Sequence, residues 1–343
     1  MIRALAALVG WLALVSASAP MPVAQSVISG DTLPRSLSEF RFFTDGIGHT
    51  PNDRVRPYAL NTPLFSDYAL KNRFVYVPEG QTATYNADGV FEFPVGSALI
   101  KSFGYPADFR DPDSQIRWLE TRVLLRRESG WVALPYVWNE DGSDATLRRA
   151  GRRMPVSWID ANGETQEISY RVPNQNQCKT CHARNDEIAL IGPNARNLND
   201  GTRLAQWVDW SILDQAPADA PRVPVWDDPG SGTLDERARA YLDINCAHCH
   251  EREGSASNSG LFLSYNEGQT VARGILKRPV AAGRGSGGRD FDIEPGHPER
   301  SIFIFRMQSR DPGIAMPELG RGMLHEEGIA LIEAYIAAMD EQS

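Results

Sequence analysis

The chain has 343 residues, and its formal net charge at pH 7 is −9. A chain of this length has room for two or three domains that each bury a core. The acidic balance and the scarcity of Lys and Arg clusters argue against nucleic acid as a partner, because phosphate neutralisation requires concentrated positive charge.

The chain starts with the pattern of a secretory signal peptide, predicted over residues 1–17. Residues 1–3 are short and basic, residues 4–15 are apolar, and small residues follow at the cleavage position. An uncleaved anchor is the alternative. No later apolar run is long enough for a transmembrane helix. We therefore expect a bacterial periplasmic protein with no integral membrane segment after cleavage.

Residues 31–172 are predicted to form strands. Short alternating or β-branched runs are separated by turn residues at Asp88-Gly89, Ser129-Gly130 and Asn162-Gly163. Such pairs suit hairpin turns that need a positive φ. The pattern predicts an N-terminal antiparallel all-β domain, either a sandwich or a barrel.

Two copies of the motif Cys-x-x-Cys-His follow, one in residues 173–224 and one in residues 233–343. Together they use all four cysteines of the chain. In this spacing each thiol adds to a vinyl group of a porphyrin, and the histidine coordinates the iron. The motifs predict two covalently bound haem c groups, held by Cys178, Cys181, His182, Cys246, Cys249 and His250.

Other uses of paired cysteines are a zinc ribbon, a redox pair and structural disulfides. Zinc-ribbon pairs are usually separated by roughly 15–20 residues, whereas 64 residues lie between Cys181 and Cys246. A zinc ribbon also leaves the two trailing histidines without a role. The spacing therefore favours haem, with zinc and disulfides as the alternatives.

Residues 233–343 are predicted to form an α-helical cytochrome c-type domain around the second haem. Thr233 and Glu236 make a capping box at the start of a helix that leads to the second motif. A second helix is expected near the C-terminus, from the apolar spacing of residues 329–339. Met316, in a loop with Pro317, is the expected sixth ligand of the second iron. The alternative for Met316 is a core filler, as most methionines are.

Short matches over most of the chain carry a family resemblance. They are residues 63–67 with Lys71 and Arg73, 93–96 with 101–103, 120–122, 136–141, 174–177, 245–247, 295–298 with Ser301 and Arg306, and 316–317. With the two haem motifs, this combination resembles a family of secreted proteobacterial dihaem c-type cytochromes with an N-terminal β domain. The C-terminal part is also similar to the cytochrome c modules of quinoprotein dehydrogenases. The resemblance implies electron transfer through haem c and names no substrate.

The first haem lacks an obvious sixth ligand, because no Met, His or Lys lies between His182 and Cys246. The ligand must come from elsewhere or be absent. His325 is the first choice and His49 the second. Met154 and His297 are further candidates, although an ordinary structural role is the alternative for all four.

Two functions follow from the predicted haems. In the first, both irons are six-coordinate and the protein is an electron carrier between redox partner proteins. In the second, the first iron is five-coordinate and the protein is a haem enzyme, peroxidase-like or acting on a small substrate. The ligand chemistry favours the carrier. Tryptophans of the β domain leave carbohydrate or organic-substrate binding as a third possibility, although such residues more often form the core.

Overall fold

The computed structural model describes residues 20–45, 50–185 and 187–340. The predicted signal peptide and the ligand candidate His49 lie outside these residues. Strands account for 24% and helices for 23% of the structure. Among the described residues, no helix is long and apolar enough to cross a membrane.

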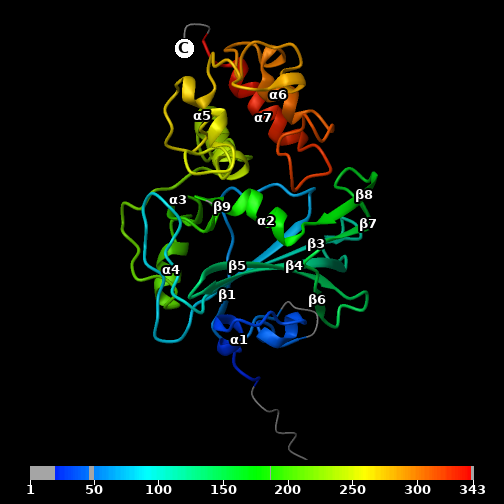
Figure 1. Ribbon diagram of the computed structural model, residues 1–343, viewed down its shortest axis with the longest axis vertical. Coiled ribbons are helices and arrows are strands. Elements are labelled where there is room, and N and C mark those ends of the chain that lie inside the picture. The colour runs from blue at the N-terminus through cyan, green and yellow to red at the C-terminus, as the bar shows by residue number, and fades with distance from the viewer. Residues whose placement is uncertain (1–19, 46–49, 186, 341–343) are drawn as a thin grey trace, which may run out of the picture.

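A six-stranded antiparallel sheet forms the middle of the molecule (Figure 1). Its strands follow one another in sequence order: β1 (Val55–Pro57), β2 (Leu70–Tyr76), β3 (Ala98–Pro106), β4 (Ile116–Arg127), β5 (Gly130–Trp138) and β6 (Ala145–Leu147). A separate hairpin consists of β7 (Arg152–Ile159) and β8 (Thr165–Val172). Two further short strands, β9 (Ala183–Arg184) and β10 (Glu187–Ile188), pair with each other.

Seven short α-helices are present in the described residues. They are α1 (Gln25–Ser29), α2 (Gln175–His182), α3 (Ala195–Leu198), α4 (Arg203–Asp209), α5 (Leu234–Leu242), α6 (Ile302–Met307) and α7 (Glu326–Ala337). The predicted capping box of Thr233 and Glu236 begins α5. A similar box, formed by Asn174 and Gln177, begins α2. The longest helix, α7, has only 12 residues.

The predicted fold class is therefore wrong. The described residues contain no evident α-helical cytochrome-like domain over 233–343, since between α5 and α7 the chain runs through loops, 3-10 turns and the six-residue helix α6. Glycines with positive φ interrupt this region at Gly260, Gly274 and Gly287, where a regular helix cannot continue. The β part is one open sheet with a packed hairpin, which differs from the expected sandwich or barrel.

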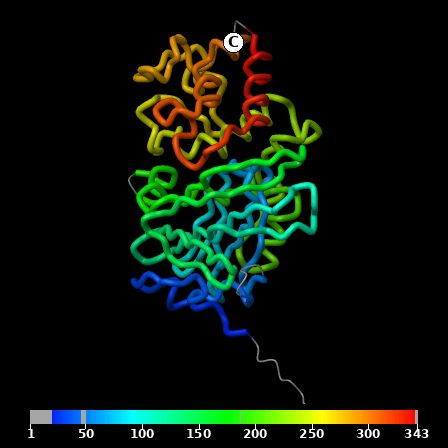
Figure 2. The backbone as a smooth tube through the Cα atoms, turned by 90° about the vertical axis from the view of Figure 1, so that its right-hand side faces the viewer, coloured from blue at the N-terminus to red at the C-terminus, as the bar shows by residue number. Residues whose placement is uncertain are grey.

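Four hydrophobic clusters stabilise the layers. One face of the sheet packs against the N-terminal segment through residues such as Ile28, Phe40 and Ile100. Other clusters join the sheet to α3 and α4 and to the hairpin of β7 and β8. The fourth cluster lies among α5, α6 and α7, which sit together at the end of the molecule opposite α1 (Figures 1 and 2).

The segment of residues 61–68 joins the sheet to the helical end. The amide of Phe65 donates to Asn245 Oδ1 over 2.8 Å, next to the second Cys-x-x-Cys-His motif. Asp67 Oδ1 accepts hydrogen bonds from the amides of Gly322 (2.7 Å) and Met323 (2.8 Å). The segment that leads into β2 is thereby bonded to the π-helical turn Asp243–Ala247 and to the loop at residues 322–323.

Candidate functional site

The first motif lies on α2 and its end. Cys178 and Cys181 are half-buried and unpaired. His182 is the last residue of the helix, and its Nδ1 lies 2.9 Å from the carbonyl oxygen of Ala189. A ring nitrogen that donates to a carbonyl leaves the other nitrogen deprotonated and oriented as a metal ligand. His182 Nε2 is therefore the atom suited to bind iron.

The second motif lies beyond the end of α5, starting in the π-helical turn Asp243–Ala247 and ending in the turn that follows it. Asn245, which precedes the motif, is buried and also donates to the Tyr241 carbonyl over 3.0 Å. His250 Nδ1 is 3.3 Å from Ser259 Oγ. Cys246 and Cys249 are unpaired thiols. Each motif thus presents two free thiols and one imidazole, the set that haem c attachment requires.

The fold brings the two motifs into contact. One ligand atom from each of Cys181, His248 and Cys249 lies within 4.8 Å of the others. The carbonyl of Thr180 accepts hydrogen bonds from Cys249 Sγ (3.6 Å) and Ser255 Oγ (2.9 Å). The motifs are therefore neighbours in space despite their separation in sequence.

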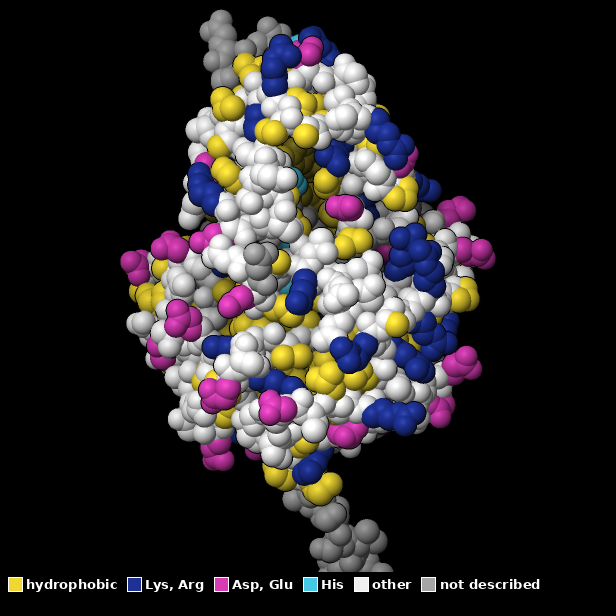
Figure 3. Space-filling view, viewed as in Figure 1, with side chains coloured by type: hydrophobic (Ala, Val, Ile, Leu, Met, Phe, Trp, Pro, Cys, Tyr) yellow, Lys and Arg dark blue, Asp and Glu magenta, His cyan; other side chains and the backbone are white. Residues whose placement is uncertain are grey.

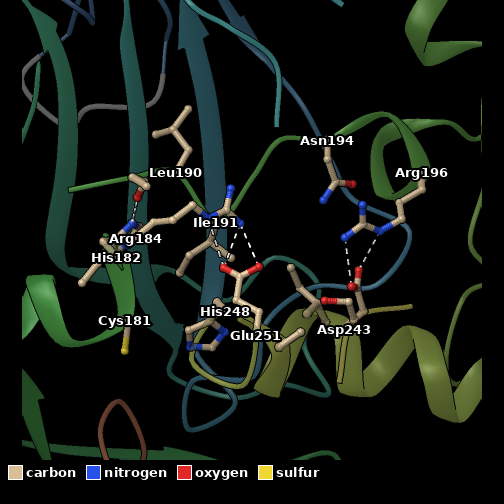
Figure 4. A pocket seen from close by; sticks show the side chains of 15 residues that line it. Cys181, His182, Arg184, Leu190, Ile191, Asn194, Arg196, Asp243, His248 and Glu251 are labelled. Carbon is tan, nitrogen blue, oxygen red and sulfur yellow. Dashed lines mark hydrogen bonds and ion pairs between the residues drawn. The ribbon is translucent and has the colours of Figure 1, made fainter. Parts of the chain in front are cut away.

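An ion pair reinforces this contact (Figure 4). Arg184, just after the first motif, lies 2.8 Å from a carboxylate oxygen of Glu251, just after the second. The amide of Asn185 also donates to the carbonyl of Glu253 over 3.3 Å. Both motifs are thereby fixed to each other by backbone and side-chain bonds.

The thiols and imidazoles of the site have shifted pKa values. A hydrogen bond from Cys181 lowers the pKa of Cys249 to about 3, while the pKa of Cys181 is raised by the same contact. Burial raises the pKa of Cys246 to about 12 and lowers that of His182 to about 4. The hydrogen bond from Cys181 therefore favours the thiolate form at Cys249 and the thiol form at Cys181. The imidazole of His182 stays neutral, which is the form that binds iron.

Two adjoining cavities lie beside the motifs. The first, about 50 Å³, touches Cys181, His182 and His248 (Figure 4). The second, about 370 Å³, continues toward Val90 and Tyr265, and Arg184 and Glu251 line both. Binding pockets for small molecules usually measure ≈ 300–1,000 Å³, so only the second falls within this range. At the helical end of the face in Figure 3, a hollow with hydrophobic and histidine side chains in it opens to the surface.

The candidate sixth ligands of the two irons lie in different parts of the structure. Met316 is half-buried in a loop, and its amide donates to the Arg306 carbonyl over 3.0 Å. Met154 is a residue of β7 and is buried in the hydrophobic cluster between the hairpin and the sheet, so it serves packing. His297 is 3.3 Å from Glu299 near the surface.

His325 occupies an aromatic cage. Its ring stacks on Phe65 with centroids 4.1 Å apart, and Trp226 packs edge-on at 4.9 Å. Its Nδ1 is 2.9 Å from the Tyr241 hydroxyl, and its Nε2 is 3.8 Å from Glu327. Both ring nitrogens therefore already face polar groups that belong to the helical end of the molecule.

Two features of the site were missed by reasoning from the sequence. His248, inside the second motif, reaches the first motif and lowers the pKa of His182 by its charge. Its Nδ1 is buried without a hydrogen-bond partner among the described residues. The second feature is a row of cationic side chains on the sheet beneath α2. The histidine between the two cysteines of the second motif was the sequence signal for the contact of His248. The cationic row depends on strand register, which the sequence does not show.

No family model, no curated protein and no solved structure matches this chain. The resemblance to secreted dihaem cytochromes therefore stays a prediction from motifs.

Proposed function

We propose that the protein is a periplasmic dihaem c-type cytochrome that transfers electrons between redox partner proteins. The observation that carries this proposal is the direct contact between two Cys-x-x-Cys-His motifs, through Cys181 and Cys249. The donor set fits haem c, because all four thiols are free and the imidazole of His182 is held by a backbone carbonyl. Bound haem supplies a one-electron iron couple.

Each residue of the motifs has a defined role in this proposal. Cys178 and Cys181 attach the first haem, and Cys246 and Cys249 attach the second. His182 and His250 provide proximal nitrogens. Met316 would complete the coordination at the second motif, where a thioether would raise the reduction potential relative to a second nitrogen.

The contacts between the motifs support an internal electron relay between the two proposed haem sites. The Thr180 carbonyl and the pair of Arg184 and Glu251 fix the motifs relative to each other. A fixed, short separation means that no conformational change is required for exchange between the two sites. Haem groups held by the two motifs would then exchange an electron without rearrangement of the chain, and the protein would pass it from one partner to another.

Denaturing mass spectrometry of the exported protein tests the proposal. We expect a mass increment of two haems, and an increment of one in a variant with Cys178→Ser and Cys181→Ser. The matched pair Cys246→Ser and Cys249→Ser should also retain one. A mass without haem, together with one equivalent of zinc by elemental analysis, would instead assign Cys181, His248 and Cys249 to a zinc site.

A haem enzyme is the second candidate, and the surroundings of His325 favour it. The first-choice ligand of the first iron is caged by Phe65, Trp226 and Tyr241, with both nitrogens facing polar groups. An iron without a distal residue can bind a substrate such as peroxide. Electron paramagnetic resonance of the oxidised protein separates the two functions. Two low-spin signals support the carrier, and a high-spin signal from one iron supports the enzyme.

A further inference from the structure

Three cationic side chains lie next to one another across the sheet. Arg73 of β2 is paired with Lys101 of β3, and Lys101 is paired with Arg122 of β4. Directly paired residues in neighbouring strands point to the same face of a sheet, and like charges in such pairs are destabilising. Lys71 lies two residues before Arg73 and therefore shares this face. Four cations are thus gathered on one small area.

The carboxylates of this area do not balance the cations. Glu120, completely buried, accepts two hydrogen bonds from Arg122 (2.6 and 2.9 Å). Asp67 lies near Lys71 but is bonded to the amides of a loop. Two carboxylates therefore face four basic side chains, which leaves a surplus of two positive charges when all six groups are ionised.

Arg73 is the member of the row whose buried charge most clearly lacks a partner. The residue is only 9% exposed, and its Nη2 is buried without a hydrogen-bond partner among the described residues. A buried guanidinium without an anionic partner is costly, since desolvation of a charge is offset only by pairing. Arg122, in contrast, is 32% exposed, so the row can be reached from solvent.

The row adjoins the first haem motif. The helix α2 packs over the sheet at β5. The charges of Lys101 and Arg122 lower the pKa of His182, and Arg122 also acts on that of Cys178. Burial and the neighbouring cations lower the pKa of Lys101, and burial lowers that of Lys71 to about 7. A bound anion would offset these effects and favour the charged form of both lysines.

We propose that Arg73 and Lys101, flanked by Lys71 and Arg122, form a carboxylate-binding site beside the first Cys-x-x-Cys-His motif. Arg presents a planar fork that matches a carboxylate, and Lys adds a point charge. The carboxylate has two possible sources, a propionate of the first haem or a small organic acid from solution. The first source rests on the proposed function, whereas the second is independent of it.

The experiment uses the full exported protein and two readouts. Isothermal titration with succinate measures binding of a free carboxylate, and a spectroscopic redox titration measures the midpoint potential of each haem. The variants are Lys101→Gln and Arg73→Gln. Removing a cation from a surplus leaves no carboxylate unpaired, so both variants should fold. Arg153→Gln, an exposed arginine of β7, is the matched control.

The two sources predict different results. If a free carboxylate binds, succinate shows saturable binding that weakens about tenfold in Lys101→Gln, or about 1.4 kcal/mol, while the potentials stay constant. If a propionate occupies the site, succinate does not bind, and the potential of one haem falls in both variants because a nearby positive charge is lost. Lys101→Arg should retain the wild-type behaviour. The proposal is overturned if succinate does not bind and both potentials are unchanged, or if Arg153→Gln has the same effect. If the purified protein carries no haem, only the proposed function is refuted. The titration with succinate then still tests the carboxylate-binding site.

Discussion

Replacing Glu120 by Gln is the sharpest test of the charge arrangement on the sheet. Its carboxylate is fully buried, is paired with Arg122 over 2.6 and 2.9 Å, and accepts a hydrogen bond of 2.6 Å from the Tyr170 hydroxyl. Removing one member of a buried ion pair costs about 3–5 kcal/mol, because it leaves the other charge without compensation. The same change increases the cationic surplus from two to three. Since Arg122 is 32% exposed and water can partly solvate its charge, we expect the lower end of this range, a loss of about 3 kcal/mol in the free energy of unfolding.

Urea unfolding followed by tryptophan fluorescence measures this loss. Glu167→Gln is the matched control, since Glu167 is an exposed residue of β8 and should change stability by less than about 0.5 kcal/mol. A double variant, Glu120→Gln with Arg122→Gln, should recover part of the loss because both charges are gone. The reasoning fails if Glu120→Gln is no more destabilising than the control, or if the double variant is less stable than the single one.

Three other substitutions have defined outcomes. Met316→Ala should lower the potential of one haem in a redox titration without changing the haem content; two unchanged potentials would make Met316 a packing residue. Asp67→Ala should cost about 2 kcal/mol and speed hydrogen exchange of the Gly322 amide, because the alanine cannot accept that bond and Asp67 has a φ of 49°. Asp67→Asn keeps an acceptor and should cost less. Burial lowers the pKa of His325 to about 4 in the folded protein, whereas an unfolded histidine has a pKa of about 6.5. As the pH falls from about 6.5 to about 4, the unfolded chain therefore takes up a proton before the folded one does, and the free energy of unfolding decreases. Between pH 7 and 5 the wild type should lose about 2 kcal/mol more than His325→Gln; equal losses would mean that the ring of His325 does not titrate there.

Local sequence patterns predicted individual hairpins and helices better than they predicted how these elements are arranged in the fold. The hairpins at Gly130 and Gly163 form where the turn residues indicated, and both glycines have the positive φ that such turns require. At Asp88 and Gly89 the outcome differs. There the Asn86 side chain accepts hydrogen bonds from both amides, and the flanking residues make only an isolated bridge between Thr84 and Glu92. A side chain that bonds the backbone replaced the expected longer ladder.

The helical domain was predicted wrongly for a related reason. A capping box and an apolar stripe are local signals, and both produced helices, α5 and α7. They do not determine the residues between them. That region contains Gly260, Gly274 and Gly287 in the left-handed conformation, and it forms 3-10 turns. Two helices at the ends of a segment therefore did not imply a helical domain.

In the candidate site, too, features within one short segment were predicted, and contacts between distant segments were not. Motif spacing predicts which cysteines and histidines belong together, because attachment chemistry acts within five consecutive residues. It does not predict that Cys181 meets Cys249, since that contact depends on how two segments pack. The cationic row is also invisible in the sequence. Arg73, Lys101 and Arg122 become neighbours only through the register of three strands.

The stretch from Phe65 to Arg73 links these separate parts into one unit. Phe65 bonds to the residue before the second motif, Asp67 bonds to the loop that follows Met316, and Arg73 belongs to the row beside the first motif. Displacement of this one stretch would disturb all three sites together. The β sheet is therefore more than a spacer ahead of the motifs. It places the cationic row beside the first motif, and the segment that enters its strand β2 is bonded to the residue before the second motif.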